Sequence, residues 1–422
     1  MFGKAGRERL IWLAFGSYVA MTLAAGPARM YLSTVGLSPL IYIPNLLLIV
    51  ACVWQLLAEP FEHGADAMRL MALAIIGYAS VVGFLFLSPI QSIMGVYVLL
   101  PFFFGLSCGR TILSQWQKAE PWVPIAFALV AGAIIANQFV EYPWEGYAYA
   151  VGDLDVDGSR QWYANGGQKR LAGMARASFD AAAQVQLLGI VMTLQSRSIL
   201  MRMAYWGITV MAIVPTNSKG ILLVWLVLTP VVILQRHLSQ SLIRPIPAFF
   251  GSIGLALPLS TLAFEFNSTF QNPTLASATF SFYDRLNRMW PEAWALLEES
   301  GSVLLGRGIG AIGTAQTYFE PSRFNAGDNI FMYWFVVFGA LALPGFIFFL
   351  MRTLRLKPLR SQRELLLFCW VVTTLVYGAM TNIVENAILA LTCGVVVRAL
   401  ASSEVFYQSD DRHIYGGKPH GI

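Results

Sequence analysis

An acid and an amide, Asp328 and Asn329, stand at the start of more than twenty mostly apolar residues in AGDNIFMYWFVVFGALALPGFIFFL (326–350). Asp and Asn are favoured where a helix begins, because their side-chain oxygen accepts a hydrogen bond from a free backbone N–H group. A carboxylate in this position can also take a proton from a hydroxyl group, as a general base does. Asp328 is therefore either a helix cap or a catalytic residue, with Asn329 beside it.

Three basic residues, Lys219, Arg285 and Arg288, occupy positions where they could hold an anion. Lys219 follows TNS and opens an apolar segment, so it either reaches for the membrane interface or contacts a phosphate. Arg285 and Arg288 lie in SFYDRLNRMWPEAW, just before a short amphipathic helix predicted to begin at Pro291 and to end at Gly301. Helix N-termini attract anions and arginine adds bidentate contacts, so the two arginines are either solvated or part of a phosphate clamp.

The stretch GRGIGAIG (306–313) contains the GxGxxG pattern of dinucleotide sites, at Gly308, Gly310 and Gly313. No strand is predicted before it, and the loop is predicted to face outward, where nucleotide cofactors are scarce. We therefore expect either a flexible turn or a nest of backbone amides that contacts phosphate.

No metal site is predicted. The stretch DLDVDG (153–158) opens like a calcium-binding loop with Asp153, Asp155 and Asp157, but position twelve is Ala164 in place of a bidentate Glu. An incomplete site or a solvated acidic turn is the prediction. The histidines all map to the predicted cytoplasmic side, so chemistry on the outside must use a carboxylate, a lysine or the substrate itself; they are His63, His237, His413 and His420.

The elements that position these residues are predicted to be membrane helices. The 422 residues are 57% hydrophobic and 12% charged, with a mean hydropathy of +0.61, which is too apolar for an ordinary soluble protein. We predict an all-α, polytopic integral membrane protein in which residues 1–422 form a single membrane domain. Apolar stretches of the length needed to cross a bilayer predict about twelve transmembrane helices, near residues 9–26, 38–58, 69–88, 91–108, 121–138, 180–196, 198–215, 219–235, 245–263, 329–351, 364–381 and 385–401.

The distribution of basic residues predicts that both termini are cytoplasmic, with the first segment a retained signal anchor. Of the 28 Lys and Arg residues, the ten on the predicted outer side are Arg29, Arg160, Lys169, Arg170, Arg176, Lys219, Arg285, Arg288, Arg307 and Arg323. Most of them lie in two long periplasmic loops, 139–179 and 264–327. The second loop separates helices 9 and 10 and carries the amphipathic helix. The net charge of +5 needs no nucleic acid to explain it, and the four cysteines fall inside apolar segments as small buried side chains.

Three pieces, in this order along the chain, resemble the O-antigen ligase and O-antigen polymerase family of bacterial envelope enzymes: TNSKGILL (216–223), RLNRMWPEAWALLEESGSVLLGRGIGAIG (285–313) and AGDNIFMYWFVVFGALAL (326–343). A weaker fourth piece, RLAGMARASFDAAAQ (170–184), is similar to the family's Arg-x-x-Gly segment. The resemblance extends over roughly residues 165–400, and its motifs are short and degenerate.

The resemblance implies an inverting glycosyltransferase of the bacterial inner membrane, working on its periplasmic face without metal or cofactor. The implied donor is a glycan on undecaprenyl pyrophosphate. The implied acceptor is a hydroxyl group on another lipid-linked glycan or on lipid A core, and bilayer lipids and other polysaccharide-assembly proteins are further expected partners. Carried over by position, the family's pyrophosphate ligands fall on Arg170, Lys219, Arg288 (with Arg285 as the fallback), Gly308 and Gly310, and its catalytic pair falls on Asp328 and Asn329.

Two positions depart from the family's pattern. Lys219 replaces an arginine, so a point charge replaces a planar fork. Asp328 replaces the histidine of the ligases, which favours a polymerase or exopolysaccharide-assembly relative over a ligase. A flippase for lipid-linked oligosaccharide, or an inactive scaffold in an export complex, remains an alternative.

Overall fold

The computed structural model describes residues 3–58, 65–151, 154–164, 167–234, 237, 240–266, 273–356 and 361–401. The described chain is mostly helical, and each of the twelve apolar segments predicted above contains helix. Apolar stretches of this length form helices because a helix satisfies its backbone groups internally. The prediction of an all-α chain needs one correction, since loop 139–179 also contains four short strands.

The helices of the first half differ in length, and two pairs of consecutive helices, α1–α2 and α5–α6, are bent. The longest is α4, and α1 and α2 are nearly perpendicular, with a bend of 89°. In chain order the helices are α1 (Lys4–Leu23), α2 (Ala25–Thr34), α3 (Ile43–Ala58), α4 (Ala65–Phe86), α5 (Pro89–Val98), α6 (Leu100–Ser114), α7 (Val123–Ala136), α8 (Ser178–Gln195) and α9 (Ile199–Ile213).

The second half begins at the TNSKGILL motif. Its helices are α10 (Lys219–Leu234), α11 (Gln240–Ile243), α12 (Pro245–Ser260), α13 (Pro273–Asp284), α14 (Trp290–Ser300), α15 (Thr314–Phe319), α16 (Ile330–Phe338), α17 (Ala342–Leu354), α18 (Gln362–Gly378) and α19 (Ala387–Ala401).

Several of these helices are apolar and long enough to cross a membrane. Among the described residues five spans meet this requirement, or seven if each of two bent pairs counts as one span. They run over Ser38–Leu57, Trp116–Ala136, Ile199–Thr216, Ser241–Ser260 and Ile330–Leu354, with the bent pairs α1–α2 and α5–α6. The membrane character is thus supported, whereas the number twelve is not confirmed, because the described parts of the other helices do not meet this requirement of length and composition.

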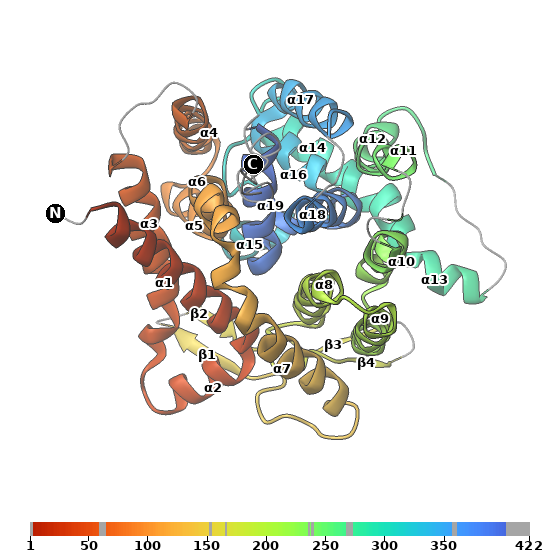
Figure 1. Ribbon diagram of the computed structural model, residues 1–422. Coiled ribbons are helices and arrows are strands. Elements are labelled where there is room, and N and C mark those ends of the chain that lie inside the picture. The colour runs from red at the N-terminus through yellow and green to blue at the C-terminus, as the bar shows by residue number, and fades with distance from the viewer. Residues whose placement is uncertain are drawn as a thin grey trace, which may run out of the picture.

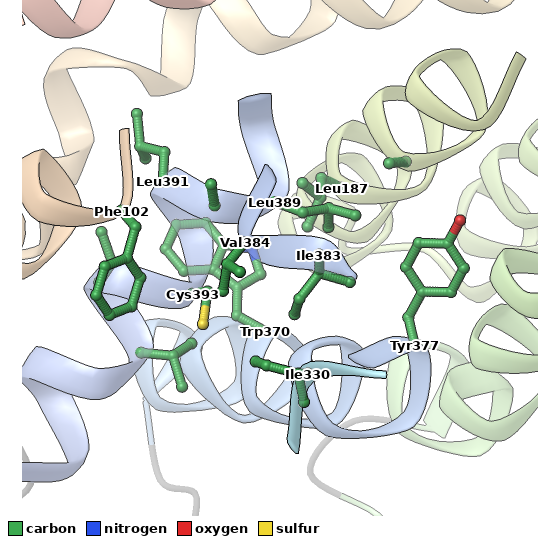
Figure 2. Close-up of a cluster of buried hydrophobic side chains, with 14 of the residues drawn as sticks. Phe102, Leu187, Ile330, Trp370, Tyr377, Ile383, Val384, Leu389, Leu391 and Cys393 are labelled. Carbon is green, nitrogen blue, oxygen red and sulfur yellow. The ribbon is translucent and has the colours of Figure 1, made fainter. Parts of the chain in front are cut away.

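Helices α18 and α19 lie near the centre of the bundle, and α13 projects from its edge (Figure 1). A shared apolar core joins α18 and α19 to α6, α8 and α16 (Figure 2). Representative side chains of this core are Phe102, Leu187, Ile330, Trp370 and Leu391. All four cysteines are buried and unpaired, as the sequence predicts.

The two long loops are ordered in different ways. In loop 139–179, β1 (Ala148–Val151) pairs antiparallel with β2 (Leu154–Asp157), and β3 (Trp162–Tyr163) pairs with β4 (Lys169–Arg170). Loop 264–327 is largely helical over its described part, where α13, α14 and α15 lie. Helix α14 lies where the amphipathic helix was expected and has its proline in the first turn and Gly301 as its C-terminal cap, but the chain is already helical over Arg285–Met289 before it.

Candidate functional site

The site is built around an ion pair between two segments that are far apart in the sequence. The guanidinium of Arg285 donates to a carboxylate oxygen of Asp328 at 2.7 Å, and the two side chains are only 17% and 22% exposed. The hydroxyl of Thr381 lies 3.4 Å from the other carboxylate oxygen. Asp328 is therefore held in a defined orientation but remains reachable from solvent.

The neighbouring Asn329 has a structural role that fully occupies its side chain. Its oxygen accepts from the backbone N–H groups of Phe331 and Met332 and so caps α16. Its amide group donates to the carbonyls of Gly254 and Ala379, which belong to two other segments. The cap of α16 is thus Asn329, and Asp328 is not needed for that purpose.

The two arginines of RLNRM point to different partners. The stretch Arg285–Met289 is a π-helical turn that continues α13 into α14. The expectation that both arginines precede a free helix N-terminus is therefore wrong, because the helix does not begin at Pro291. A π turn is wider than an α turn, so residues three positions apart no longer share a face. Arg285 reaches Asp328, whereas Arg288 turns outward.

Arg288 is engaged on the surface. It pairs with Asp284 through two bonds of 2.8 and 2.9 Å and approaches Glu292 at 3.4 Å, with 56% of its side chain exposed. The hydrogen bonds to Asp284 raise the pKa of Arg288 above its ordinary value. The structure therefore brings Arg285, not Arg288, to Asp328.

The TNSKGILL motif places the start of α10 beside the same region. Asn217 has a φ of 54°, in the left-handed region that Asn tolerates better than most residues, and this turn presents exposed Lys219 as the first residue of α10. The backbone of Gly220 lies against the ring of Tyr377, and a Cβ here would come within 2.8 Å of a ring carbon. Glycine at this position therefore allows α10 to approach α18 closely.

Arg170, at the end of β4, is fastened to the same turn. Its Nε donates to the carbonyl of Thr216 at 3.1 Å, and its guanidinium lies 5.8 Å from the ring centre of Trp162. Burial lowers the pKa of Arg170, and Tyr377 acts in the opposite direction. A half-buried cation of this kind gains from an anionic partner, because the anion offsets the loss of hydration.

Tyr377 connects these parts, and sequence reasoning missed it. It is 6% exposed, lies at the C-terminal end of α18, and is within Coulombic reach of Asp328, Arg170 and Arg285. Its hydroxyl points away from the apolar core (Figure 2). One signal in the sequence could have indicated it. Tyr377 lies at the predicted outer end of an apolar segment, next to polar residues.

Gly308 and Gly310 lie elsewhere and serve in packing. Both have a φ of +89°, and both are buried against helices of the first half. A Cβ on Gly310 would lie 2.5 Å from the carbonyl oxygen of Gln91. The amide of Gly308 donates to Val337, near the end of α16 remote from Asp328. Nine residues of helix correspond to about 13 Å, so the structure does not bring these glycines to the ion pair.

The acidic and histidine residues considered as metal ligands in the sequence are only partly described by the structure. Among the described residues no group of three or more His, Cys, Asp or Glu side chains could hold a metal ion. Asp153 lies outside the described residues, and Asp157 pairs with Arg160 at 3.1 Å. His237 is described, while His63, His413 and His420 are outside the described ranges.

The chemistry that this arrangement supports is the binding of an anion next to a carboxylate. Arg285 pairs with Asp328, and this pair is largely shielded from water. Arg170, like the pair, lies within Coulombic reach of Tyr377, and Lys219 directly precedes Gly220, whose backbone lies against the ring of Tyr377. Hydrogen bonds from charged donors are roughly twice as strong as neutral ones, and guanidinium groups match phosphate geometry. A phosphorylated substrate with a reactive hydroxyl group nearby would satisfy both kinds of residue.

Comparison of the chain with protein-family models, with curated proteins and with solved structures returned no match.

Proposed function

We propose that the protein is an inverting, metal-independent glycosyltransferase that uses a glycan on undecaprenyl pyrophosphate as donor. The observation that carries the proposal is the shielded ion pair between Arg285 and Asp328. It joins a pyrophosphate ligand and a general base, both implied by the resemblance, in one contact. Arg170 and the start of α10 flank it on the side of Tyr377.

In the proposed reaction the donor exchanges partners within the ion pair. Its pyrophosphate takes the guanidinium of Arg285, which leaves the carboxylate of Asp328 available to the acceptor. The acceptor oxygen forms a bond to the anomeric carbon, and the bond from that carbon to the pyrophosphate oxygen breaks, with its electron pair leaving on the pyrophosphate. The hydroxyl proton passes to Asp328. Attack from the face opposite the leaving group inverts the anomeric centre.

The other cations have separate tasks in this proposal. Arg170, half-buried and anchored on Thr216, offers its remaining N–H groups to the donor pyrophosphate. Lys219, exposed at the start of α10, contributes a charge where the helix dipole also favours an anion. Lysine gives a point contact where arginine would give a fork, so we expect Lys219 to strengthen binding less than Arg285 does.

We further propose that the protein lies in the inner membrane of a bacterium, with all twelve apolar helical segments in the bilayer and this site facing the periplasm. An aspartate in place of a ligase histidine favours a polymerase, in which the acceptor is a second lipid-linked glycan, over transfer to lipid A core. Other polysaccharide-assembly proteins are expected partners. No nucleic acid is expected.

The test is reconstitution of the full chain in lipid vesicles with a lipid-pyrophosphate glycan donor. We expect release of undecaprenyl pyrophosphate together with longer lipid-linked glycan. In cells that lack the protein, single unpolymerised repeats on a gel of surface polysaccharide would support a polymerase, and free lipid-linked polymer with bare core a ligase. Accumulation of the lipid-linked glycan on the inner leaflet would contradict the proposal and indicate a flippase.

A further inference from the structure

A second group of arginines lies apart from the ion pair of Arg285 and Asp328. Arg29 belongs to α2, Arg160 follows β2, and Arg176 precedes α8. Backbone hydrogen bonds hold the three segments together. The N–H of Arg160 donates to the carbonyl of Arg176 at 2.7 Å, and that of Gly26, one turn before Arg29, donates to the carbonyl of Met174 at 2.8 Å. Three arginines distant in sequence are thus fixed in one place.

All three arginines are half-buried and lie within Coulombic reach of one carboxylate, that of Asp180 in the first turn of α8. Arg176 also lies within Coulombic reach of Arg29 and Arg160. Burial first, and then repulsion by Arg29 and Arg160, lowers its pKa to about 10. Gathering like charges at a half-buried site is unfavourable unless an opposite charge compensates them.

Among the described residues, Arg160 is the one arginine of the three that forms an ion pair with a carboxylate. Asp157 pairs with Arg160 at 3.1 Å and has 58% of its side chain exposed. Asp180 accepts a hydrogen bond of 2.6 Å from Asn386. Arg176 donates its Nε–H to the backbone carbonyl of Asp157 rather than to a carboxylate. Glu385 also lies within Coulombic reach of Arg160, and its carboxylate accepts from the N–H and the hydroxyl of Thr314. Three acids therefore lie near the three guanidinium groups, but among the described residues none of them forms an ion pair with Arg29 or Arg176.

The hydrogen-bonding capacity of the group is also incompletely used. Within the described part of the chain, the Nε of Arg29 is enclosed and has no hydrogen-bond partner. Two phenols, those of Tyr97 and Tyr318, lie within Coulombic reach of Arg176. A buried donor without an acceptor costs about 1–3 kcal/mol. An anion with oxygens in several directions would supply the missing acceptor and would bond directly to guanidinium groups that no carboxylate pairs with among the described residues.

We propose that Arg29, Arg160 and Arg176 form a second anion site, which binds the phosphoryl group of a lipid-linked acceptor. The assignment of this anion to an acceptor rests on the proposed function. A phosphoryl group fits three guanidinium groups that come from three segments, because its oxygens spread in three dimensions, whereas a carboxylate lies in one plane. Asp180 lies within Coulombic reach of both Arg176 and Tyr377, and Arg160 lines one pocket together with Arg170, so an acceptor phosphoryl group bound here would lie next to the proposed donor ligands.

The binding test uses the full chain in lipid nanodiscs, titrated with geranylgeranyl pyrophosphate and, in parallel, with inorganic pyrophosphate. We expect two equivalents of the lipid probe per wild-type chain. Arg29→Gln with Arg176→Gln should weaken one equivalent by at least about tenfold, and Arg285→Gln should weaken the other. Arg29→Gln with Arg176→Lys should weaken binding less than the double Gln variant. Arg323→Gln removes an exposed cation on the same proposed outer side and should leave the affinity of both equivalents unchanged.

The outcomes separate the two proposals. A single equivalent in the wild type, or two unchanged equivalents in the Arg29 and Arg176 variant with a wild-type melting temperature, would overturn the second site. Should the double variant not fold, Arg29→Gln alone is measured against the same criterion. If Arg285→Gln binds both equivalents with wild-type affinity, the result contradicts the donor site and leaves the second site standing. Equal binding of inorganic pyrophosphate would refute the assignment to a lipid-borne phosphoryl group.

Discussion

Arg285 and Arg288 are three residues apart in one helical turn, and of the two we expect only Arg285 to bind the donor. Arg285→Gln removes the guanidinium that bonds Asp328 at 2.7 Å, and Arg288→Gln removes one that bonds only surface acids. Both changes delete one positive charge from the same loop. They are therefore a matched pair, in which a general electrostatic effect would appear equally in both variants.

The magnitudes differ because the two side chains differ in exposure. A hydrogen bond from a charged donor is worth about 1.5–3 kcal/mol, which corresponds to a loss of about 10- to 150-fold in donor affinity for Arg285→Gln. Pairs on an exposed surface contribute about 0.2–1 kcal/mol. The Arg288 side chain is 56% exposed, so Arg288→Gln should change donor affinity by about fivefold at most.

The assay measures binding of a polyprenyl pyrophosphate to each variant in nanodiscs, together with the rate of glycan transfer. Thermal melting of each variant serves as the control for folding. A larger loss of affinity in Arg288→Gln than in Arg285→Gln would refute the placement of the donor at Asp328. Equal losses would indicate a diffuse field over the loop in place of a defined contact.

Further changes test the structure around the site. Gly220→Ala should lower the melting temperature and donor affinity together, because its Cβ would lie 2.8 Å from the ring of Tyr377 and the clash outweighs the gain of about 1 kcal/mol in helix preference. Asn329→Asp should destabilise the folded protein by about 2 kcal/mol or more, since it removes both amide donors to neighbouring carbonyls. Burial tends to raise the pKa of Glu320, but the hydrogen bonds from Arg307 and Gln91 and the charges of Arg307 and Arg323 together lower it. The stability that these interactions contribute is therefore complete above the unfolded pKa of about 4.3 and is lost as the pH falls through the lower folded value. Melting curves from pH 6 downward should show a steeper decline for wild type than for Glu320→Gln, and parallel declines would contradict the assignment.

Hydropathy predicted where the helices lie, because an apolar run must satisfy its own backbone groups in a membrane. It did not predict which runs are long enough to span. Helix α18, for example, has 17 residues, Gln362–Gly378, with described residues on both sides, and is shorter than the spanning helices. The bend of 89° between α1 and α2 also has no signal in the average composition of that segment.

The site was partly visible in the sequence. Asp328, Lys219 and Arg170 belong to short motifs in the sequence. In the structure Asp328 and Arg170 lie within Coulombic reach of Tyr377, and Gly220, the residue after Lys219, lies against its ring. The resemblance assigned the second pyrophosphate ligand to Arg288, with Arg285 as the fallback, whereas it is Arg285 that pairs with Asp328. This placement depends on a π turn that the sequence pattern does not predict. Tyr377 was missed, since a tyrosine at the end of an apolar segment is ordinarily an interface residue.

The glycine-rich turn is a motif that the sequence placed in the site and that the structure places elsewhere. Glycines with positive φ suit a phosphate-binding nest and a tightly packed turn equally well, and only the neighbours decide between them. At Gly310 the neighbour is the backbone of α5, so packing explains the residue.

The central claim is that Asp328 takes the proton of the acceptor, and Asp328→Asn tests it most directly. The cap of α16 is Asn329, so this change leaves the start of the helix intact. General bases contribute about 10²- to 10⁴-fold to a rate, and the account predicts a loss of transfer in this range with donor binding retained. Asp284→Asn, which removes the partner of Arg288, is the matched control and should transfer normally. Transfer at the wild-type rate by Asp328→Asn would contradict the account.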